Sequence, residues 1–521
     1  MKRCSFLRHI VFVVLFLSLS VYTASGQSKS PKGERSLVIL HDNDVHCAID
    51  GYAKVAGLRD AIRDTADVLL VSSGDFLQGA VAGAISKGQY IVDIMKTVGY
   101  DAVAFGNHEF DYKIPRLREL MAQIHAPVVC ANLVDMKTGK TLFAPYIIRG
   151  VGRHRVAFVG AVTPSTMQSD RFAFYSDKGE VLYSLMPEQV YSLVQKAVDK
   201  ARAEGADIVV VLSHLGEDKT DEDVDSHGLV AKTRGIDVVF DAHTHSLIVA
   251  DTVRNLDGKP IVITQTGSSF ANIGKCLIMP DGRMSQSMIP VSEIKHRNGR
   301  VAMATEEVKK RMEQVTSRVV GHCDYVLRIL DDADEYLVRY AETNAADLLA
   351  DAFIAATGAE IAIINGGGIR NQPKAGDLTY GDFISMLPYD NLLQVVEVKG
   401  STIVELLRLN TMNMSYDNGN FPQVAGVRYT IHTGIHSVTD VEVLQADGKY
   451  APIEPDRYYK VATMDYCVTG GGFGGILRDS KVLQQTNINY RDAMIDFVEK
   501  DLKGVIGINY AKPQGRITVV E

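Results

Sequence analysis

The stretch DAVAFGNHEFD at residues 101–111 joins a short apolar run to a polar turn that carries an amide, an imidazole and two carboxylates. Four further apolar runs end in polar turns, HDNDVH at 41–46, SSGD at 72–75, SH at 213–214 and DAHTH at 241–245. Apolar runs that alternate with helical patterns predict βα units around a largely buried sheet. Ligands of such sheets lie where strand carboxyl ends converge, so these endings predict one shared site.

The chemistry of these endings indicates a metal centre. One Asp or His after one strand would mean little, because Asp forms turns and a lone His is more often structural. Five endings together favour a site over coincidence. Imidazole, carboxylate and amide groups without thiolate are typical of Zn, Mn, Co or Fe. The ligands outnumber what one tetrahedral ion needs, which predicts two ions that clamp the oxygens of a phosphoryl transfer.

The series D-x-H, G-D, G-N-H-E, S-H and H-x-H resembles the calcineurin-like metallophosphoesterases and, within them, the secreted 5'-nucleotidase family. The resemblance extends over nearly all of the mature chain. It implies an α/β protein, with an N-terminal four-layer αββα metallophosphoesterase sandwich and a mixed α/β C-terminal substrate-binding domain. It also implies two overlapping ligand groups that share Asp75 as a bridge. One metal would be held by Asp44, His46, Asp75 and His245, and the other by Asp75, Asn107, His214 and His243.

The resemblance places His108 at the phosphoryl group instead of on a metal. Asp111, three residues on, would hold the imidazole and favour its charged form, although a helix N-cap is the alternative for this residue. His41 and Asp42 match no family position, and we interpret them as second-layer or surface residues. Ala242 stands where the family usually has glycine, and alanine restricts that turn more.

The second half of the chain has a different pattern. We expect one long helix over 336–357, then a strand at 360–364 followed by the turn NGGGIR at 365–370. This turn, the PYDN motif at 388–391 and the GGGF motif at 470–473 resemble the nucleotide-binding domain of 5'-nucleotidases. Core packing is the alternative for the two aromatic residues. The substrate contacts implied by the resemblance are Arg339, Asn365, Arg370, Tyr389, Asn391, Phe473 and Asp479.

The first 26 residues have a basic, then apolar, then small-residue pattern, which predicts a cleaved signal peptide and a secreted or periplasmic protein. An uncleaved anchor is the alternative, but the apolar run is short for a bilayer span. Cleavage would remove three positive charges, so the net charge of −8 would become −8 − 3 = −11. The negative charge predicts no nucleic acid partner. We expect no stable membrane anchor after leader cleavage, because no other stretch is long enough and free enough of charge to span a bilayer. Of the six cysteines, one lies in this leader, and we expect the other five to be buried and to form at most two disulfides.

A chain of 521 residues allows two or three domains, and its 46% hydrophobic content excludes a disordered or fibrous protein. We predict a signal peptide at 1–26, a metallophosphoesterase domain at 36–300, a linker helix and hinge at 301–335 and a nucleotide-binding domain at 336–521. By resemblance, the second domain would rotate about this hinge to carry substrate to the metals.

The predicted function is hydrolysis of nucleoside 5'-phosphates by a metal-activated hydroxide, with His108 and Asp111 assisting and two divalent ions (Zn, Mn or Co) as cofactors. The alternatives are a 2',3'-cyclic nucleotide 2'-phosphodiesterase with 3'-nucleotidase activity and a UDP-sugar pyrophosphatase. A thiosulfate-ester hydrolase and a non-catalytic exported nucleotide-binding protein fit less well. The sequence leaves open the metal, the base preference, the phosphate chain length and the oligomeric state.

Overall fold

The computed structural model describes residues 35–520 except 177–178 and 218–223, and residues 35–521 form one compact unit. The signal peptide expected at 1–26 lies outside the described residues. Within the described part, no helix is both long enough and apolar enough to cross a bilayer. The five cysteines outside the expected leader are buried and unpaired, so their predicted burial is confirmed.

The first half contains two sheets that pack face to face. The first has the order β14-β13-β1-β2-β3, and the second has the order β11-β12-β10-β9-β7-β6. The strands of the first sheet are β1 (Leu37–Asp42), β2 (Asp67–Ser72), β3 (Ala102–Val103), β13 (Asn272–Ile278) and β14 (Met284–Pro290). Those of the second are β6 (Tyr146–Val151), β7 (His154–Val162), β9 (Ile208–His214), β10 (Val238–Phe240), β11 (Leu247–Arg254) and β12 (Pro260–Thr266).

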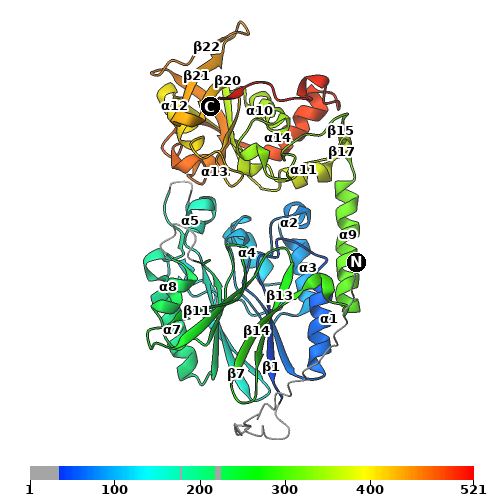
Figure 1. Cartoon of the computed structure of the whole chain (residues 1–521), viewed down its shortest axis with the longest axis vertical. Coiled ribbons are helices and arrows are strands. Elements are labelled where there is room, and N and C mark those ends of the chain that lie inside the picture. The colour runs from blue at the N-terminus through cyan, green and yellow to red at the C-terminus, as the bar shows by residue number, and fades with distance from the viewer. Residues whose placement is uncertain (1–34, 177–178, 218–223, 521) are drawn as a thin grey trace, which may run out of the picture. The chain divides into compact units, whose positions relative to one another are not determined.

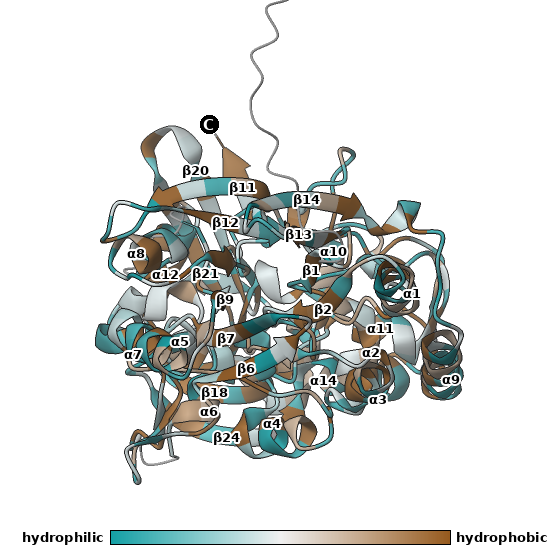
Figure 2. Cartoon of the chain, turned by 90° about the horizontal axis from the view of Figure 1, so that it is seen from below, coloured by the Kyte–Doolittle hydropathy of each residue, from teal (hydrophilic) through white to brown (hydrophobic). Residues whose placement is uncertain are grey.

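Alternation along the strands explains why helices cover both outer faces. In β1, Leu37 and Ile39 pack in the apolar cluster between the sheets, whereas Val38 and Leu40 pack in the cluster under the helices. The helices on the first sheet are α1 (Tyr52–Arg63), α3 (Gln89–Val98) and α9 (Gly299–Thr316), and those on the second are α7 (Val190–Ala203) and α8 (Ser226–Ala231). Figure 2 shows the strands between these two groups of helices. The predicted four-layer αββα sandwich is confirmed.

The second half has its own core and a five-stranded sheet of order β19-β16-β23-β18-β24. Its strands are β16 (Ile361–Asn365), β18 (Leu392–Lys399), β19 (Pro422–Ala425), β23 (Tyr458–Met464) and β24 (Lys481–Asn489). Helix α9 of the first half leads toward it in Figure 1. A smaller sheet of order β22-β21-β20-β25 packs beside it; its strands are β20 (Val427–His432), β21 (Ser437–Leu444), β22 (Tyr450–Pro452) and β25 (Ile517–Val520). The helices of this mixed α/β part include α10 (Asn344–Thr357), α12 (Gly400–Asn410) and α14 (Tyr490–Asp496).

Two expected helical stretches differ from the structure. The helix predicted over 336–357 begins only at Asn344, because the Thr343 side chain accepts a hydrogen bond from the Ala346 N–H and caps it there. Leu337–Arg339 forms a separate 3-10 turn. The expected linker helix ends at Thr316, and Val319–Cys323 is strand β15, which pairs with β17 (Gly376–Thr379).

Candidate metal centre and substrate cavity

The predicted metal ligands all follow or end strands of the two packed sheets, at the edge where the strands' carboxyl ends meet. His214 is the last residue of β9, and Asp75 follows β2 by three residues. Five of the seven adopt the left-handed conformation, which is uncommon for residues with a side chain and clusters at functional sites. These are Asp44, His46, Asp75, His243 and His245, with φ between 45° and 82°.

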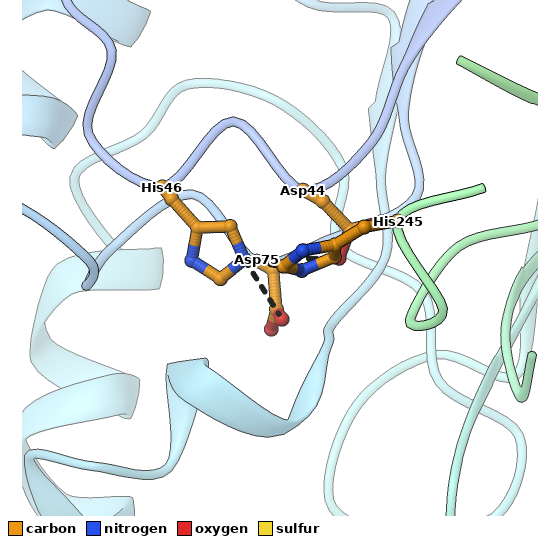
Figure 3. A group of neighbouring side chains, drawn as sticks. All are labelled: Asp44, His46, Asp75 and His245. Atoms are coloured by element: carbon orange, nitrogen blue, oxygen red, sulfur yellow. Dashed lines mark hydrogen bonds and ion pairs between the residues drawn. The ribbon is translucent and has the colours of Figure 1, made fainter. Parts of the chain in front are cut away.

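The first predicted ligand group is brought together. One ligand atom from each of Asp44, His46, Asp75 and His245 lies within 4.8 Å of the others, and Figure 3 shows the four side chains gathered around one point. The Nε2 atoms of His46 and His245 are 2.9 Å apart. The Asp75 Oδ2 atom lies 3.7 Å from His46 Nε2. This spacing fits a single ion among four donors.

The second predicted group adjoins the first through Asp75. The Asp75 Oδ2 atom lies 3.3 Å from His214 Nε2, so one carboxylate oxygen faces both groups. The His243 Nδ1 atom lies 3.0 Å from the Asn107 Oδ1 atom, and the His214 and His243 ring centroids are 5.4 Å apart. The structure therefore brings all seven predicted ligands to one place.

The donor chemistry of this cluster fits divalent cations. Among the described residues, Asp44 Oδ1 and His214 Nε2 are buried and make no hydrogen bond. Buried lone pairs without a donor are costly, and a cation would satisfy them. Burial lowers the pKa of His46 to about 4, which keeps this imidazole neutral, as a ligand must be. Burial opposes charge on His214, but Asp75 and Asp44 raise its pKa to about 10, a measure of the negative charge that a cation would meet.

Hydrogen bonds to the backbone orient the ligands. The Nδ1 atoms of His46 and His214 lie 3.0 and 2.8 Å from the carbonyl oxygens of Gln78 and Ser73. A carbonyl only accepts, so each Nδ1 donates and each Nε2 is left with its lone pair toward the cluster. Asp44 Oδ2 accepts from the His243 N–H at 3.0 Å, which ties the turns after β1 and β10 together.

His108 and Asp111 form the predicted pair beside the metal cluster. The His108 Nδ1 atom lies 3.0 Å from Asp111 Oδ2, and the His108 backbone N–H donates to Asp75 Oδ1 at 2.9 Å. Burial opposes charge on the imidazole, but Asp111 and then Asp75 raise the pKa of His108 well above its usual range. The geometry therefore favours a cationic imidazole at the mouth of the cluster.

Glu109 is a supporting residue that the sequence reasoning missed. This fully buried carboxylate accepts the backbone N–H groups of Asp75, Phe76, Leu77 and Gly106 at 2.6–3.1 Å. These bonds fix the turn after β2, which presents Asp75. The only sequence signal was its place directly after His108 in the strand ending at 101–111.

Replacing Glu109 by glutamine should destabilise the protein by about 1–3 kcal/mol, because the added amide would face N–H donors and leave some of them unpaired. We also expect divalent-metal affinity to fall by roughly 10–100-fold, since the Asp75 turn loses its support. Urea unfolding and metal titration would measure both effects. Glu119→Gln, on the exposed side of α4 (Lys113–Met121), is the matched control, and equal behaviour of the two variants would contradict this role.

His41 and Asp42, which we interpreted as second-layer or surface residues, are buried, so the surface alternative is wrong and the second-layer one fits. His41 stacks on Phe240, with ring centroids 4.0 Å apart, and Asp42 accepts from the Tyr100 hydroxyl at 2.7 Å. Asp241 is also buried and accepts from the Ser226 hydroxyl at 2.6 Å. These buried contacts stabilise the strand ends that carry the predicted ligands.

A cavity of about 1010 Å³ opens beside the metal cluster and is lined by both halves of the chain. The first half contributes Asn107, His108 and Asp111, and the second contributes Arg339, Asn365, Arg370, Tyr389 and Asn391. Five of the seven predicted substrate contacts thus share one cavity with the predicted catalytic pair. The lining residues that the sequence reasoning missed include Lys113, Asp170, Tyr466 and Arg491.

The structure does not bring Phe473 or Asp479 to this cavity. Phe473 is fully buried in the core of the second half, where its ring packs among apolar side chains. Asp479 is exposed, and neither residue lines the cavity. The glycine-rich turn at 470–472 carries its aromatic neighbour inward, opposite to the expected direction.

Two guanidinium groups share one aromatic ring at the cavity wall. The Cζ atoms of Arg339 and Arg370 lie 4.4 and 5.8 Å from the Tyr336 ring centroid. Burial and the neighbouring Arg370 lower the pKa of Arg339, and the Arg339 Nε atom is buried without a hydrogen bond among the described residues. An anion between the two groups would relieve their repulsion and supply the missing acceptor.

Comparisons with known proteins agree with this arrangement. Residues 37–247 match the calcineurin-like phosphoesterase family, and residues 319–476 match the 5'-nucleotidase C-terminal domain. A 5'-nucleotidase of Vibrio cholerae is 25% identical over 574 residues, 99% of this chain and 100% of its own. The trifunctional nucleotide phosphoesterase of Bacillus subtilis is 28% identical over 84% of this chain, which spans only 32% of that longer protein.

Among solved structures, a 5'-nucleotidase precursor from Thermus thermophilus is similar, with a TM-score of 0.72 and 26% identity over 93% of this chain and 99% of that one. Both domain matches lie where the two halves of the fold lie, and the first includes every predicted metal ligand. The chain therefore belongs to the calcineurin-like phosphoesterases that carry a 5'-nucleotidase C-terminal domain, and it is a hydrolase of phosphoric esters.

Proposed function

We propose that this protein is an exported hydrolase that releases phosphate from nucleoside 5'-phosphates with two divalent ions. The observation that carries the proposal is one cavity with two kinds of wall. Asn107, His108 and Asp111 line one side, and Arg370 and Tyr389 line the other. A nucleoside 5'-phosphate carries a phosphate and a planar base on one small molecule. Its binding site therefore needs polar groups for the phosphate and an aromatic side chain for the base in the same cavity.

The residues of the cluster would have two roles, metal binding and contact with the phosphoryl group. Asp44, His46, Asp75 and His245 would hold one ion, and Asp75, Asn107, His214 and His243 would hold the other. When bound, two such ions supply an activated water and charge stabilisation in phosphate transfer; Zn, Mn and Co suit this donor set. His108, held by Asp111, would donate a hydrogen bond to a phosphoryl oxygen and stabilise its developing charge.

The second half would bind the nucleoside. Arg339 and Arg370 would contact the phosphate or ribose, because both guanidinium groups lie over the Tyr336 ring and both residues line the cavity. Tyr389 offers an aromatic face for the base, and Asn365 and Asn391 offer amide groups beside it. Stacking on aromatic side chains is tolerant of base identity, so we expect activity on several nucleotides.

A second candidate function is cleavage of UDP-sugars, which the cavity volume of about 1010 Å³ favours. This volume is at the upper limit of ordinary small-molecule pockets and leaves room beyond a mononucleotide. Cleavage of 2',3'-cyclic nucleotides would use the same groups.

Movement of the second half relative to the first is part of the proposal. Polar contacts between the halves include the Lys87 ammonium 3.6 Å from Asp390 Oδ2 and the Gln78 side-chain amide donating to the Pro388 carbonyl at 3.2 Å. Both lie beside the cavity. The segment at 317–335, after α9, would supply the hinge.

A substrate panel tests the proposal. The purified protein with added Mn²⁺ would be given AMP, ADP, ATP, 2',3'-cyclic AMP and UDP-glucose, with phosphate and nucleotide products quantified. We expect the highest kcat/KM for AMP. A higher kcat/KM for UDP-glucose would favour the second candidate, and failure to hydrolyse any phosphate ester under Zn²⁺, Mn²⁺ or Co²⁺ would indicate a non-catalytic nucleotide-binding protein.

A further inference from the structure

Two short helices bring a further carboxyl group to the cavity wall beside the predicted catalytic pair. Asp170 joins α5 (Thr166–Ser169) to α6 (Arg171–Phe174), and its backbone N–H donates to the Thr166 carbonyl at 2.9 Å. This bond fixes the backbone of Asp170 at the joint between the two helices. The Asp170 side chain lines the same cavity as the predicted pair, although neither a metal ligand nor a substrate contact was predicted at this position.

Aromatic packing holds α6 against the segment that carries Asp111. The Phe110 and Phe174 rings are both fully buried, and their centroids are 5.0 Å apart. Phe110 directly precedes Asp111 in the chain, and Phe174 ends the helix that follows Asp170. The packed rings therefore keep the two carboxyl side chains together, and these side chains lie within hydrogen-bond reach of each other.

A hydrogen bond between two carboxyl groups needs a proton on one of them, because a carboxylate only accepts. Asp170 is the better donor, since it is 7% exposed and forms no ion pair with lysine or arginine among the described residues. Burial and the neighbouring Asp111 raise the pKa of Asp170 well above its usual range, although the Ser169 hydroxyl donates to Asp170 Oδ2 at 2.7 Å and opposes this rise.

Asp111 is the better acceptor, because it already faces the His108 ring. The His108 Nδ1 atom lies 3.2 and 3.0 Å from Asp111 Oδ1 and Oδ2. A carboxylate with only this partner could rotate, and the imidazole would move with it. A second hydrogen bond to Asp111 restricts that rotation, and a fixed geometry is what a group that contacts the reacting phosphoryl oxygens needs.

We propose that Asp170 is a positioning residue, whose neutral carboxyl group donates a hydrogen bond to Asp111 and thereby fixes the orientation of the His108 imidazole. This inference rests on the proposed function, because it adds a third member to the pair that would contact the phosphoryl group. The role needs a hydrogen-bond donor and no charge. Asp170→Asn can supply such a donor from its amide, whereas Asp170→Ala cannot.

Steady-state kinetics with AMP separate the hydrogen bond from the charge. We expect Asp170→Ala to lower kcat by about 10–100-fold, with KM within about 2-fold of the wild type and metal content unchanged, the effect of losing a partner that orients a site residue. Asp170→Asn should keep kcat within about 3-fold, because its amide N–H replaces the carboxyl O–H. Asp199→Ala, on the exposed side of α7, is the matched control and should keep the wild-type kcat.

A double variant tests whether Asp170 acts through Asp111. The kcat of Asp111→Ala/Asp170→Ala should equal that of Asp111→Ala, because the first substitution leaves Asp170 nothing to orient. Losses that multiply in the double variant would show that Asp170 acts independently of Asp111 and would overturn the proposal.

Infrared spectroscopy detects the proton without catalysis. The spectrum of the wild type minus that of Asp170→Asn, at neutral pH, should contain the C=O stretching band of a protonated carboxylic acid. Absence of this band, wild-type kcat in Asp170→Ala, or an Asp170→Asn protein as slow as Asp170→Ala would overturn the proposal. If Asp170→Ala does not fold, the band and the kcat of Asp170→Asn still decide. If the band is present but the wild type cleaves no phosphate ester, the proposed function fails and the hydrogen bond from Asp170 to Asp111 stands.

Discussion

Replacing Asp75 by alanine should lower kcat for AMP by at least about 10³-fold. Asp75 Oδ2 lies 3.7 Å from His46 Nε2 and 3.3 Å from His214 Nε2, so the variant would remove a shared ligand of both predicted ions. Loss of bound metal removes several kcal/mol of charge stabilisation, and each 1.36 kcal/mol is tenfold in rate.

The measurement pairs phosphate release with metal content per chain. The Asp75→Ala protein should contain less metal and should regain little activity at high Mn²⁺. Asp281→Ala, in the exposed turn between β13 and β14, is the matched control and should keep full metal content and turnover. Wild-type metal content and rate in Asp75→Ala would remove Asp75 from the centre.

Replacing His108 by alanine should lower kcat by roughly 10²–10⁴-fold, the usual range for an acid–base residue, with metal content unchanged. The imidazole lies on the cavity wall and is held by Asp111 at 3.0 Å. The His108 side chain can therefore contact a phosphoryl oxygen of a substrate bound in the cavity, although His108 is not one of the predicted metal ligands. Steady-state kinetics with AMP and metal analysis of the same sample would measure both quantities.

Asp111→Asn gives an internal check on this role. The amide keeps the size of the side chain but removes its charge, so we expect a smaller loss of kcat than in His108→Ala. A His108→Ala protein with normal turnover would exclude the residue from catalysis. A His108→Ala protein that has lost its metal would instead make His108 part of the metal centre.

The candidate metal centre was predictable because its ligands follow strands directly. Asp44, Asp75 and His214 come within three residues of a strand end, so the topology alone brings them to one edge. Short turns after each strand also keep each ligand close to its strand end. The strand endings predicted only βα units around a buried sheet, and the four-layer arrangement was implied by the family resemblance that these endings carry.

The direction of a side chain in an irregular turn was not predictable. Phe473 stands beside three glycines, and its left-handed φ of 53° turns the ring into the core. Tyr466, which lines the cavity, had no motif to mark it. The start of the helix expected at residue 336 was also wrong. The helical spacing of apolar residues extends back to residue 336, but the hydrogen bond that Thr343 accepts from the Ala346 N–H sets the start of the helix at Asn344.

Supporting residues were missed because their partners are backbone groups. Glu109 is recognisable only once the turn at Asp75–Leu77 is folded against it. Tyr336 was missed for a different reason, because the two arginine side chains that lie over its ring come together with it only in the folded chain. Net charge gave little guidance, since an overall charge of −8 repels a nucleotide and only local cations and bound metal can offset it.

Metal-dependent hydrolysis of a nucleotide can be tested by one titration. Metal-free protein would be titrated with Mn²⁺ while phosphate release from AMP is recorded. We expect no release above background without metal and full activity after two equivalents per chain have bound. Release by the metal-free protein at the metal-loaded rate would contradict it.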